Sequence, residues 1–256
     1  METAGLINLV DHSGGADQGT LVRRSLYERV GQFDEALCRS QDYEMTLRLA
    51  RIGKAVGTDK IVFRQRVHAG ARGSEAMPIQ VNNRELQWIE HDKIIFRDLH
   101  ARLGIEEYLP QNEQNNIRTQ KRLALLQRAT VMARKKLWQL SIADLGEAAA
   151  LGGSPLSQRE KSVLRRAFAS KYGCAEIIEN DDLVYALSGV ARSGPAGARI
   201  VLQLANGLRW RVRAQLLAGK WLLAMRYFRA LKKLKCTVQR ELTNIGPARP
   251  HSIENF

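Results

Sequence analysis

The sequence predicts a small α/β segment followed by an almost entirely helical C-terminal region. Residues 25–30 and 40–52 have helical spacing, and each segment is followed by a glycine, a residue favoured just past a helix end. Residues 59–68 alternate apolar and polar side chains well enough for a strand. From residue 79 onward the apolar spacing is helical and no strand pattern returns.

The second of these short helices carries acidic residues at its start. Tyr43, Leu47 and Ala50 fall on one stripe, and Gly53 ends the pattern. Ser40 stands where an N-cap residue is expected, since its side-chain oxygen can accept a backbone N–H of the first turn. The pattern alone therefore predicts an amphipathic helix capped by serine.

The remaining elements are predicted to be helices separated by short breaks. A long amphipathic helix ends at Gly104, and a polar connector follows at 106–116. Ser157 and Glu160 have the Ser-x-x-Glu spacing of a capping box. The predicted helices are 79–103, 117–151, 157–172, 181–191 and 197–236, and the last includes a helix–Gly–helix pattern. The predicted domains are 1–77, 78–110 and 111–256.

Composition restricts the class of protein. The chain has 256 residues and a net charge of +14, which favours an acidic partner such as anionic lipid, nucleic acid or a phosphorylated ligand. Its three cysteines are odd in number and fit no metal pattern, which is typical of a reduced cytoplasmic protein. No apolar run reaches the roughly 18 to 20 residues of a membrane-spanning helix.

Several segments in register resemble the acceptor-side half of a family 2 glycosyltransferase. The similarity extends over residues 20–73, about a third of the chain with its helical continuation at 84–110. The family pattern runs "LVRR", a short helix, "VGGFDE", an acid opening a helix "DLxLRLAR", a strand, and "RxHxG". The matching segments here are Leu21–Arg24, Val30–Glu35, Asp42 with Leu47–Arg51, and Arg66–Gly70.

The resemblance implies both a fold and a reaction. Residues 1–77 would form the acceptor-side part of a Rossmann-like GT-A domain. The reaction would be inverting transfer of a sugar from a nucleotide-sugar donor to a saccharide or lipid-linked acceptor. The complete family enzyme is expected to use a divalent metal, Mg²⁺ or Mn²⁺.

Asp42 is the residue to which the resemblance assigns the chemistry. Inverting transfer needs a base that takes the proton from the acceptor hydroxyl, and Asp42 stands at the family's position for that base. The alternative is a first-turn carboxylate that only interacts with the helix dipole. Gln41 replaces the acid that usually precedes this Asp, and it could hydrogen-bond the acceptor. Glu44 is interpreted as a solvated surface acid.

His68 and three arginines complete the predicted site. His68 would contact the donor diphosphate or its metal, since neutral imidazole is a suitable ligand for Mn²⁺. Arg64, Arg66 and Arg72 would neutralise the departing nucleoside diphosphate. Solvated arginines at a strand edge and an ordinary loop histidine are the alternatives.

The family's nucleotide-binding half has no counterpart in this sequence. That half ends in an Asp-x-Asp motif that holds the metal, whereas Asp11 and Asp17 have the wrong spacing. We therefore expect that this polypeptide by itself does not bind a nucleotide sugar.

The basic C-terminal segment supports a second hypothesis, a non-catalytic helical binding protein. Twelve Lys and Arg residues and no acid occur between Leu183 and Arg240. Residues 197–235 could pack as an ordinary helical pair or lie on an anionic membrane surface on the cytoplasmic side. Nucleic acid is not the expected partner: residues 156–173 resemble the opening of a helix-turn-helix domain, but acids follow where bases would face phosphate.

Overall fold

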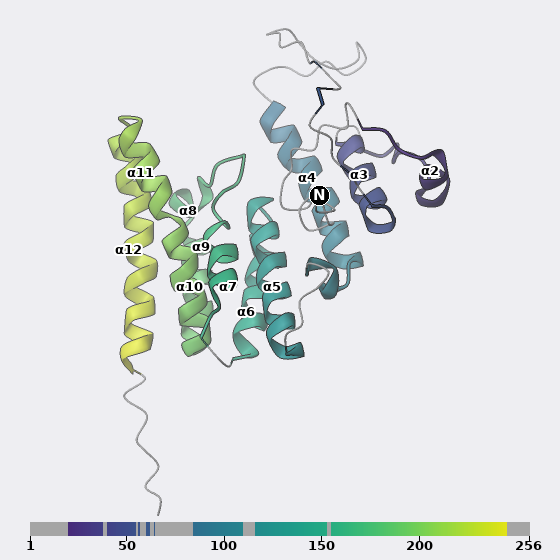
Figure 1. Ribbon diagram of the computed structural model, residues 1–256. Helices are drawn as coiled ribbons and strands as arrows, with labels where there is room; N and C mark the ends of the chain where they lie inside the picture. The colour runs from purple at the N-terminus through teal and green to yellow at the C-terminus, as the bar shows by residue number, and fades with distance from the viewer. Residues whose placement is uncertain are drawn as a thin grey trace, which may run out of the picture. The chain divides into compact units, whose positions relative to one another are not determined.

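The computed structural model describes residues 20–37, 40–54, 56, 60, 61, 64, 84–109, 116–152 and 155–244, and the regular structure in these ranges is helical (Figure 1). No strand occurs among these residues, so the predicted α/β, Rossmann-like fold is wrong. Most of the predicted strand at 59–68 lies outside the described residues. Its described members, Lys60, Ile61 and Arg64, are in no strand, and Ile61, which was expected to face inward, is 79% exposed.

The chain divides into two compact units. Unit 1 comprises residues 1–120 and 135–137, and unit 2 comprises 121–134 and 138–256. The domain boundaries predicted from the sequence at 77/78 and 110/111 stay predictions.

The described part of unit 1 is built mainly from three α-helices and one turn of 3-10 helix. They are α2 (Arg24–Val30), α3 (Gln41–Ile52), α4 (Arg84–Arg102) and η2 (Ile105–Tyr108). The predicted ends of the first two helices are confirmed: Gly31, with φ 86°, follows α2, and Gly53 follows α3. A positive φ is inexpensive only for glycine, which explains why α2 ends there.

The core of unit 1 forms where α3 meets α4. Met45 and Leu47 of α3 and Phe96 of α4 are buried. The rings of Tyr43 and Phe96 stack at 5.9 Å. Arg51 binds Glu107 of η2 through two hydrogen bonds of 2.9 and 3.0 Å.

Lys135 belongs to this core although it follows α5 in the chain. Its ammonium lies 2.7 Å from the Asp92 carboxylate and 4.3 Å from the centre of the Phe96 ring, and Lys135 and Asp92 are both buried. The next residue, Lys136, has a φ of 66°. The single helix predicted over 117–151 is therefore wrong, because the chain leaves helical geometry at this point.

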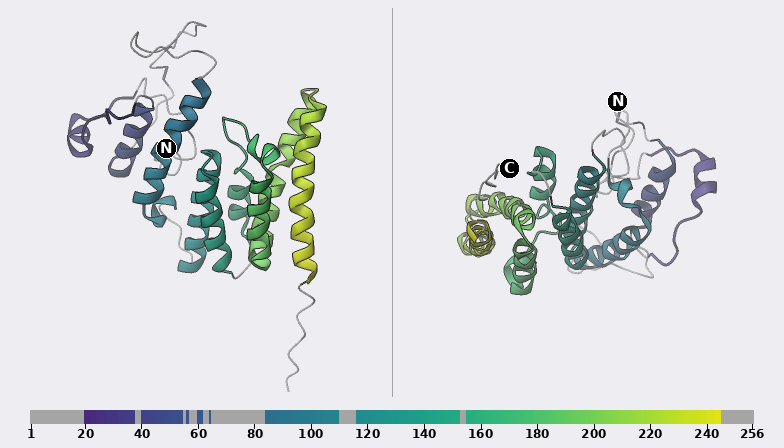
Figure 2. Two further views of the ribbon diagram at one scale, coloured as in Figure 1. Left: turned by 180° about the vertical axis from the view of Figure 1, so that it is seen from behind. Right: turned by 90° about the horizontal axis from the view of Figure 1, so that it is seen from below.

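Unit 2 is a stack of helices, and α9 and α10 lie at its centre. Its elements are α5 (Ile117–Arg134, which begins in unit 1), α6 (Trp138–Ala150), α7 (Gln158–Arg165), α8 (Glu176–Glu179), α9 (Asp181–Arg192), α10 (Pro195–Gly207), α11 (Arg209–Leu217) and α12 (Trp221–Asn244). Helix α10 contacts α6 and α7 and also α9 and α12, so α12 lies on the far side of α10 from α7 (Figures 1 and 2). Leu164, Leu187 and Ile200 are completely buried between these helices.

Two features explain how the helices of unit 2 fit together. Gly207 lies so close to α7 that a Cβ there would meet the Arg165 carbonyl oxygen at 2.5 Å, so only glycine fits. Arg128 joins α5 to α6 through two hydrogen bonds to Asp144, of 3.0 and 2.6 Å.

The C-terminal helices differ in part from the prediction. Helix α7 stops at Arg165, whereas the sequence predicted a helix over 157–172. The segment 197–236, expected to be a helical pair, forms three helices, α10, α11 and α12. The break between α11 and α12 falls at Gly219, with φ 70°, as the helix–Gly–helix pattern predicts. None of the described helices has the length and apolarity required to cross a bilayer.

Candidate functional site

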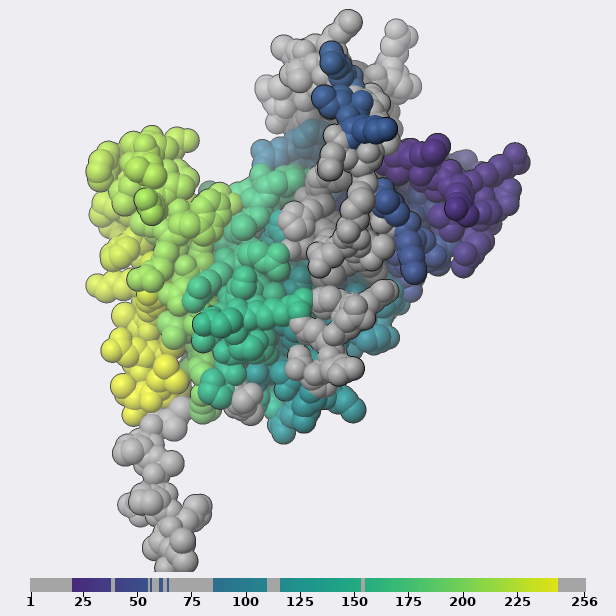
Figure 3. Space-filling model, in the orientation of Figure 1, coloured from purple at the N-terminus to yellow at the C-terminus, as the bar shows by residue number. Residues whose placement is uncertain are grey.

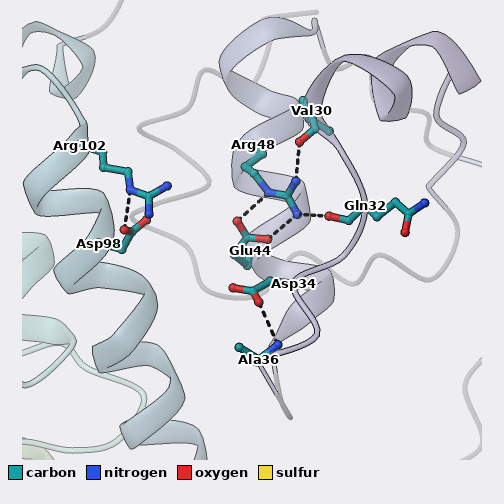
Figure 4. Close-up of polar contacts among 8 residues, drawn as sticks. All are labelled: Val30, Gln32, Asp34, Ala36, Glu44, Arg48, Asp98 and Arg102. Atoms are coloured by element: carbon teal, nitrogen blue, oxygen red, sulfur yellow. Dashed lines mark hydrogen bonds and ion pairs between the residues drawn. The ribbon is translucent and has the colours of Figure 1, made fainter.

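The loop before α3 is fixed by a single arginine. Arg48 donates hydrogen bonds to the carbonyl oxygens of Val30 at 2.6 Å and Gln32 at 2.8 Å (Figure 4). The same guanidinium donates two hydrogen bonds to Glu44, at 2.7 and 2.8 Å, across one helical turn. Arg48 thus ties the end of α2 and the following loop to α3.

Glu44 is a structural acid and not the solvated one that the sequence suggested. Its side chain is 20% exposed and that of Arg48 is 27% exposed. The bidentate geometry uses both carboxylate oxygens. Glu44 therefore holds Arg48 in position and has little freedom to bind anything else.

Asp42, two residues earlier, has a different environment. Its side chain is exposed, and Oδ1 accepts a hydrogen bond of 2.8 Å from the backbone N–H of Tyr43. It makes no ion pair with any residue that the structure describes. One carboxylate oxygen is therefore available to a molecule that approaches the start of α3.

The start of α3 is not capped as predicted. Ser40 precedes the helix, but it has left-handed backbone angles, φ 57° and ψ 19°, and its side chain makes no capping hydrogen bond. A capping serine normally has extended backbone angles that aim its oxygen at the first turn. The predicted capping role of Ser40 is wrong for this geometric reason.

Tyr43 sets the direction in which Asp42 points. Its ring stacks on Phe96, and the Lys135 ammonium lies 5.0 Å from the ring centre. Successive side chains of a helix diverge by about 100°. Because Tyr43 is anchored in the core of unit 1, its neighbour Asp42 is directed away from that core.

Gln41 is held by the loop rather than presented to solvent. Its Nε2 donates a hydrogen bond of 3.3 Å to the backbone oxygen of Asp34, and the residue is half-buried. Asp34 in turn accepts a hydrogen bond of 2.9 Å from the Ala36 backbone N–H (Figure 4). Gln41 and Asp42 are therefore adjacent, and only Asp42 is exposed.

The other predicted site residues cannot be joined to Asp42. Arg64 is exposed. Arg66, His68 and Arg72 lie outside the described residues, so their predicted grouping stays a prediction. Within the described ranges, no three His, Cys, Asp or Glu side chains come together in a way that could hold a metal ion.

Only some of the contacts that build this site could have been predicted from the sequence. The Glu44–Arg48 pair has the i, i+4 spacing of helical ion pairs, which could have indicated it. Tyr43, Phe96 and Lys135 are far apart in the sequence, and no local pattern predicts their contact. Chemically, the site is the exposed carboxylate of Asp42 at the start of α3. One of its oxygens can accept a proton or a hydrogen bond from a hydroxyl group.

A scan against protein-family models, a search of curated proteins and a search of solved structures found no match to this chain.

Proposed function

We propose that this chain supplies the acceptor side of an inverting glycosyltransferase and that Asp42 is its base. The observation that supports this role is the contrast between the two acids that open α3. Glu44 is bound to Arg48 on both oxygens, whereas Asp42 is exposed and has no ion-pair partner among the described residues. The acid at the family's base position is thus the one that remains available.

The proposed chemical step is a displacement at the anomeric carbon. The acceptor hydroxyl forms a bond to that carbon, its proton passes to an oxygen of Asp42, and the bond to the diphosphate oxygen breaks, so that a nucleoside diphosphate leaves. A base within hydrogen-bond reach of the hydroxyl typically accelerates such a step by roughly 10² to 10⁴-fold. The tie from Tyr43 to Phe96 would keep the carboxylate in one place during this step.

The donor side of the site would come from the exposed Arg64 and from residues that lie outside the described ranges. Arg64, Arg66 and Arg72 are proposed to neutralise the leaving diphosphate, and His68 to contact the diphosphate or a divalent metal such as Mg²⁺ or Mn²⁺. The metal would supply further charge neutralisation on the diphosphate. The described residues contain no cluster of ligands that fits such an ion.

The test compares Asp42→Asn with a matched control. Asp98 of α4 is an exposed acid of the same unit, and its partner is Arg102 at 2.6 Å (Figure 4). Transfer of labelled sugar from a panel of nucleotide sugars to saccharide and lipid-linked acceptors would be measured for both variants. If this chain alone shows no turnover, the pair would be compared in a fusion behind the nucleotide-binding half of a family 2 enzyme.

We expect Asp42→Asn to lower kcat by roughly 10² to 10⁴-fold and to leave the donor Kd unchanged. Asp98→Asn should retain the wild-type rate. Full activity of Asp42→Asn, or a fusion no more active than its donor half alone, would overturn the proposal.

A further inference from the structure

The tip of the α11–α12 hairpin exposes a cluster of large apolar side chains. The cluster lies in the last turn of α11 and the first two turns of α12, around Gly219. Figure 3 shows this tip at the upper left, at one extremity of unit 2. Its members are Leu216 (39% exposed), Leu217 (79%), Trp221 (66%), Leu222 (82%), Met225 (53%) and Phe228 (55%).

These side chains are not part of the core of unit 2. Helix α12 already buries its opposite face, with Ala224, Tyr227, Leu231 and Leu234 at most 7% exposed. That face packs on α9, α10 and α11. An amphipathic helix normally carries polar residues on its outer face. The first two turns of α12 therefore have apolar side chains on both faces, and the outer set is largely exposed.

Exposed basic side chains accompany the cluster on α11, on the turn and on α12. Arg209, Arg213, Lys220, Arg229 and Lys232 are exposed, and none of them makes an ion pair with a described residue. No acid occurs between Leu183 and Arg240 to balance them.

Two other bases of α12, in contrast, bind residues of unit 2. Lys233 pairs with Asp181 of α9 at 2.6 Å, and Arg226 donates a hydrogen bond of 3.3 Å to the Ile178 carbonyl oxygen. In α11, Arg211 is likewise bound, to the carbonyl oxygens of Phe168 and Ser170 at 3.0 Å each. The exposed bases that remain without an ion pair to a described residue include Arg209, Arg213, Lys220, Arg229 and Lys232.

We propose that the α11–α12 tip docks on an anionic membrane surface. The apolar side chains would insert at the level of the lipid headgroups, where tryptophan is favoured, and the unpaired bases would bind lipid phosphates. An anionic membrane fits both properties of the tip: its phosphates complement bases that no acid between Leu183 and Arg240 balances, and its apolar layer accommodates exposed tryptophan, leucine and phenylalanine. This proposal is independent of Asp42 and would hold if the chain had no transferase activity.

The test is co-sedimentation of the full chain with vesicles. Phosphatidylcholine vesicles would be compared with vesicles that also contain phosphatidylglycerol, at low and high salt. Each base near an anionic surface contributes roughly fivefold to binding. We therefore expect strong, salt-sensitive binding to the phosphatidylglycerol vesicles and little binding to phosphatidylcholine alone.

Two double variants separate the apolar from the electrostatic contribution. Trp221→Ser with Leu222→Ser should weaken binding to anionic vesicles by at least tenfold at any salt concentration. Arg229→Gln with Lys232→Gln should weaken it roughly thirtyfold at low salt and less at high salt. All four side chains are exposed, so neither variant disturbs the core. Tyr185→Ser, which removes a 72% exposed ring from α9, is the control and should bind like the wild type.

Three outcomes would overturn the proposal. One is equal binding to both kinds of vesicle. The second is unchanged binding of both double variants. The third is a chain that stays in solution with anionic vesicles while it self-associates through the tip or binds an acidic protein or nucleic acid.

Discussion

Helices α3 and α7 both start after a serine, but the acids in their first turns differ in burial and in the number of their partners. At α7, Ser157 Oγ accepts the Glu160 N–H at 3.2 Å, and the Glu160 carboxylate accepts the Ser157 N–H at 2.7 Å. Glu160 is also buried and bound to Arg122 at 2.7 and 3.0 Å. At α3, Ser40 caps nothing, and Asp42 is exposed with one short backbone contact.

This difference distinguishes a structural acid from an available one. Glu160 satisfies a backbone N–H and a buried guanidinium at once, so each of its oxygens has a partner. Asp42 satisfies only its neighbour's N–H. Similar positions near a serine therefore do not imply similar roles, and the partners of each carboxylate decide between them.

The largest expected effect is at the α7 start. Glu160→Ala would leave the Arg122 guanidinium buried without its carboxylate, and we expect a loss of about 3 to 5 kcal/mol in the free energy of unfolding. Urea unfolding followed by circular dichroism measures it. The double variant Arg122→Met with Glu160→Leu should recover most of the loss. A loss below about 1 kcal/mol for Glu160→Ala would mean that the Arg122–Glu160 ion pair does not stabilise the fold.

The two serines provide the next comparison. Ser157→Ala removes a capping hydrogen bond and should cost about 1 kcal/mol. Ser40→Ala removes none and should stay within about 0.5 kcal/mol of the wild type. Matched urea titrations of the two variants test this. Equal losses would show that Ser40 caps α3 in solution.

Glu44 should have an intermediate effect that is confined to unit 1. Glu44→Gln weakens the hold on Arg48, and because the pair is partly exposed we expect a cost of about 1 kcal/mol. Amide hydrogen exchange should become faster in α2 and in the loop that Arg48 binds. Glu28→Gln, which breaks a far more exposed pair with Arg24, serves as the control and should leave exchange unchanged.

The smallest expected effect is at Asp42 itself. Asp42→Asn should change the free energy of unfolding by less than about 0.5 kcal/mol, because the exposed side chain keeps an oxygen for the Tyr43 N–H. Urea unfolding of this variant beside Glu44→Gln tests the difference between the two acids. A loss above about 1 kcal/mol would place Asp42 among the structural acids.

Several local sequence signals predicted local structure, although the predicted capping by Ser40 was wrong. The Ser157–Glu160 capping box and the helix ends at Gly31 and Gly53 are confirmed, because each depends on neighbouring residues only. The strand at 59–68 was a different kind of inference. Its alternation is a local pattern, whereas a strand requires a partner elsewhere in the chain, and none is found among the described residues.

The candidate site could be predicted only in part. The sequence placed Asp42 and Gln41 at the start of a helix, and α3 does begin there. It did not predict that Arg48 would bind Val30 and Gln32, or that Lys135 would approach the ring of Tyr43. These contacts join residues that only the tertiary fold brings together.

The location of Lys135 limits how the protein can be divided for experiments. Its partner Asp92 lies in unit 1, while the helices on either side of Lys135 lie mostly in unit 2. The chain therefore enters unit 2 at residue 121, returns to unit 1 for residues 135–137 and enters unit 2 again at residue 138. No single cut in the chain separates the two units. A fragment that stopped at Gln120 would leave a buried Asp92 carboxylate without its ammonium. Expression of α2–α4 as an independent piece would succeed only if residues 135–137 were supplied as well.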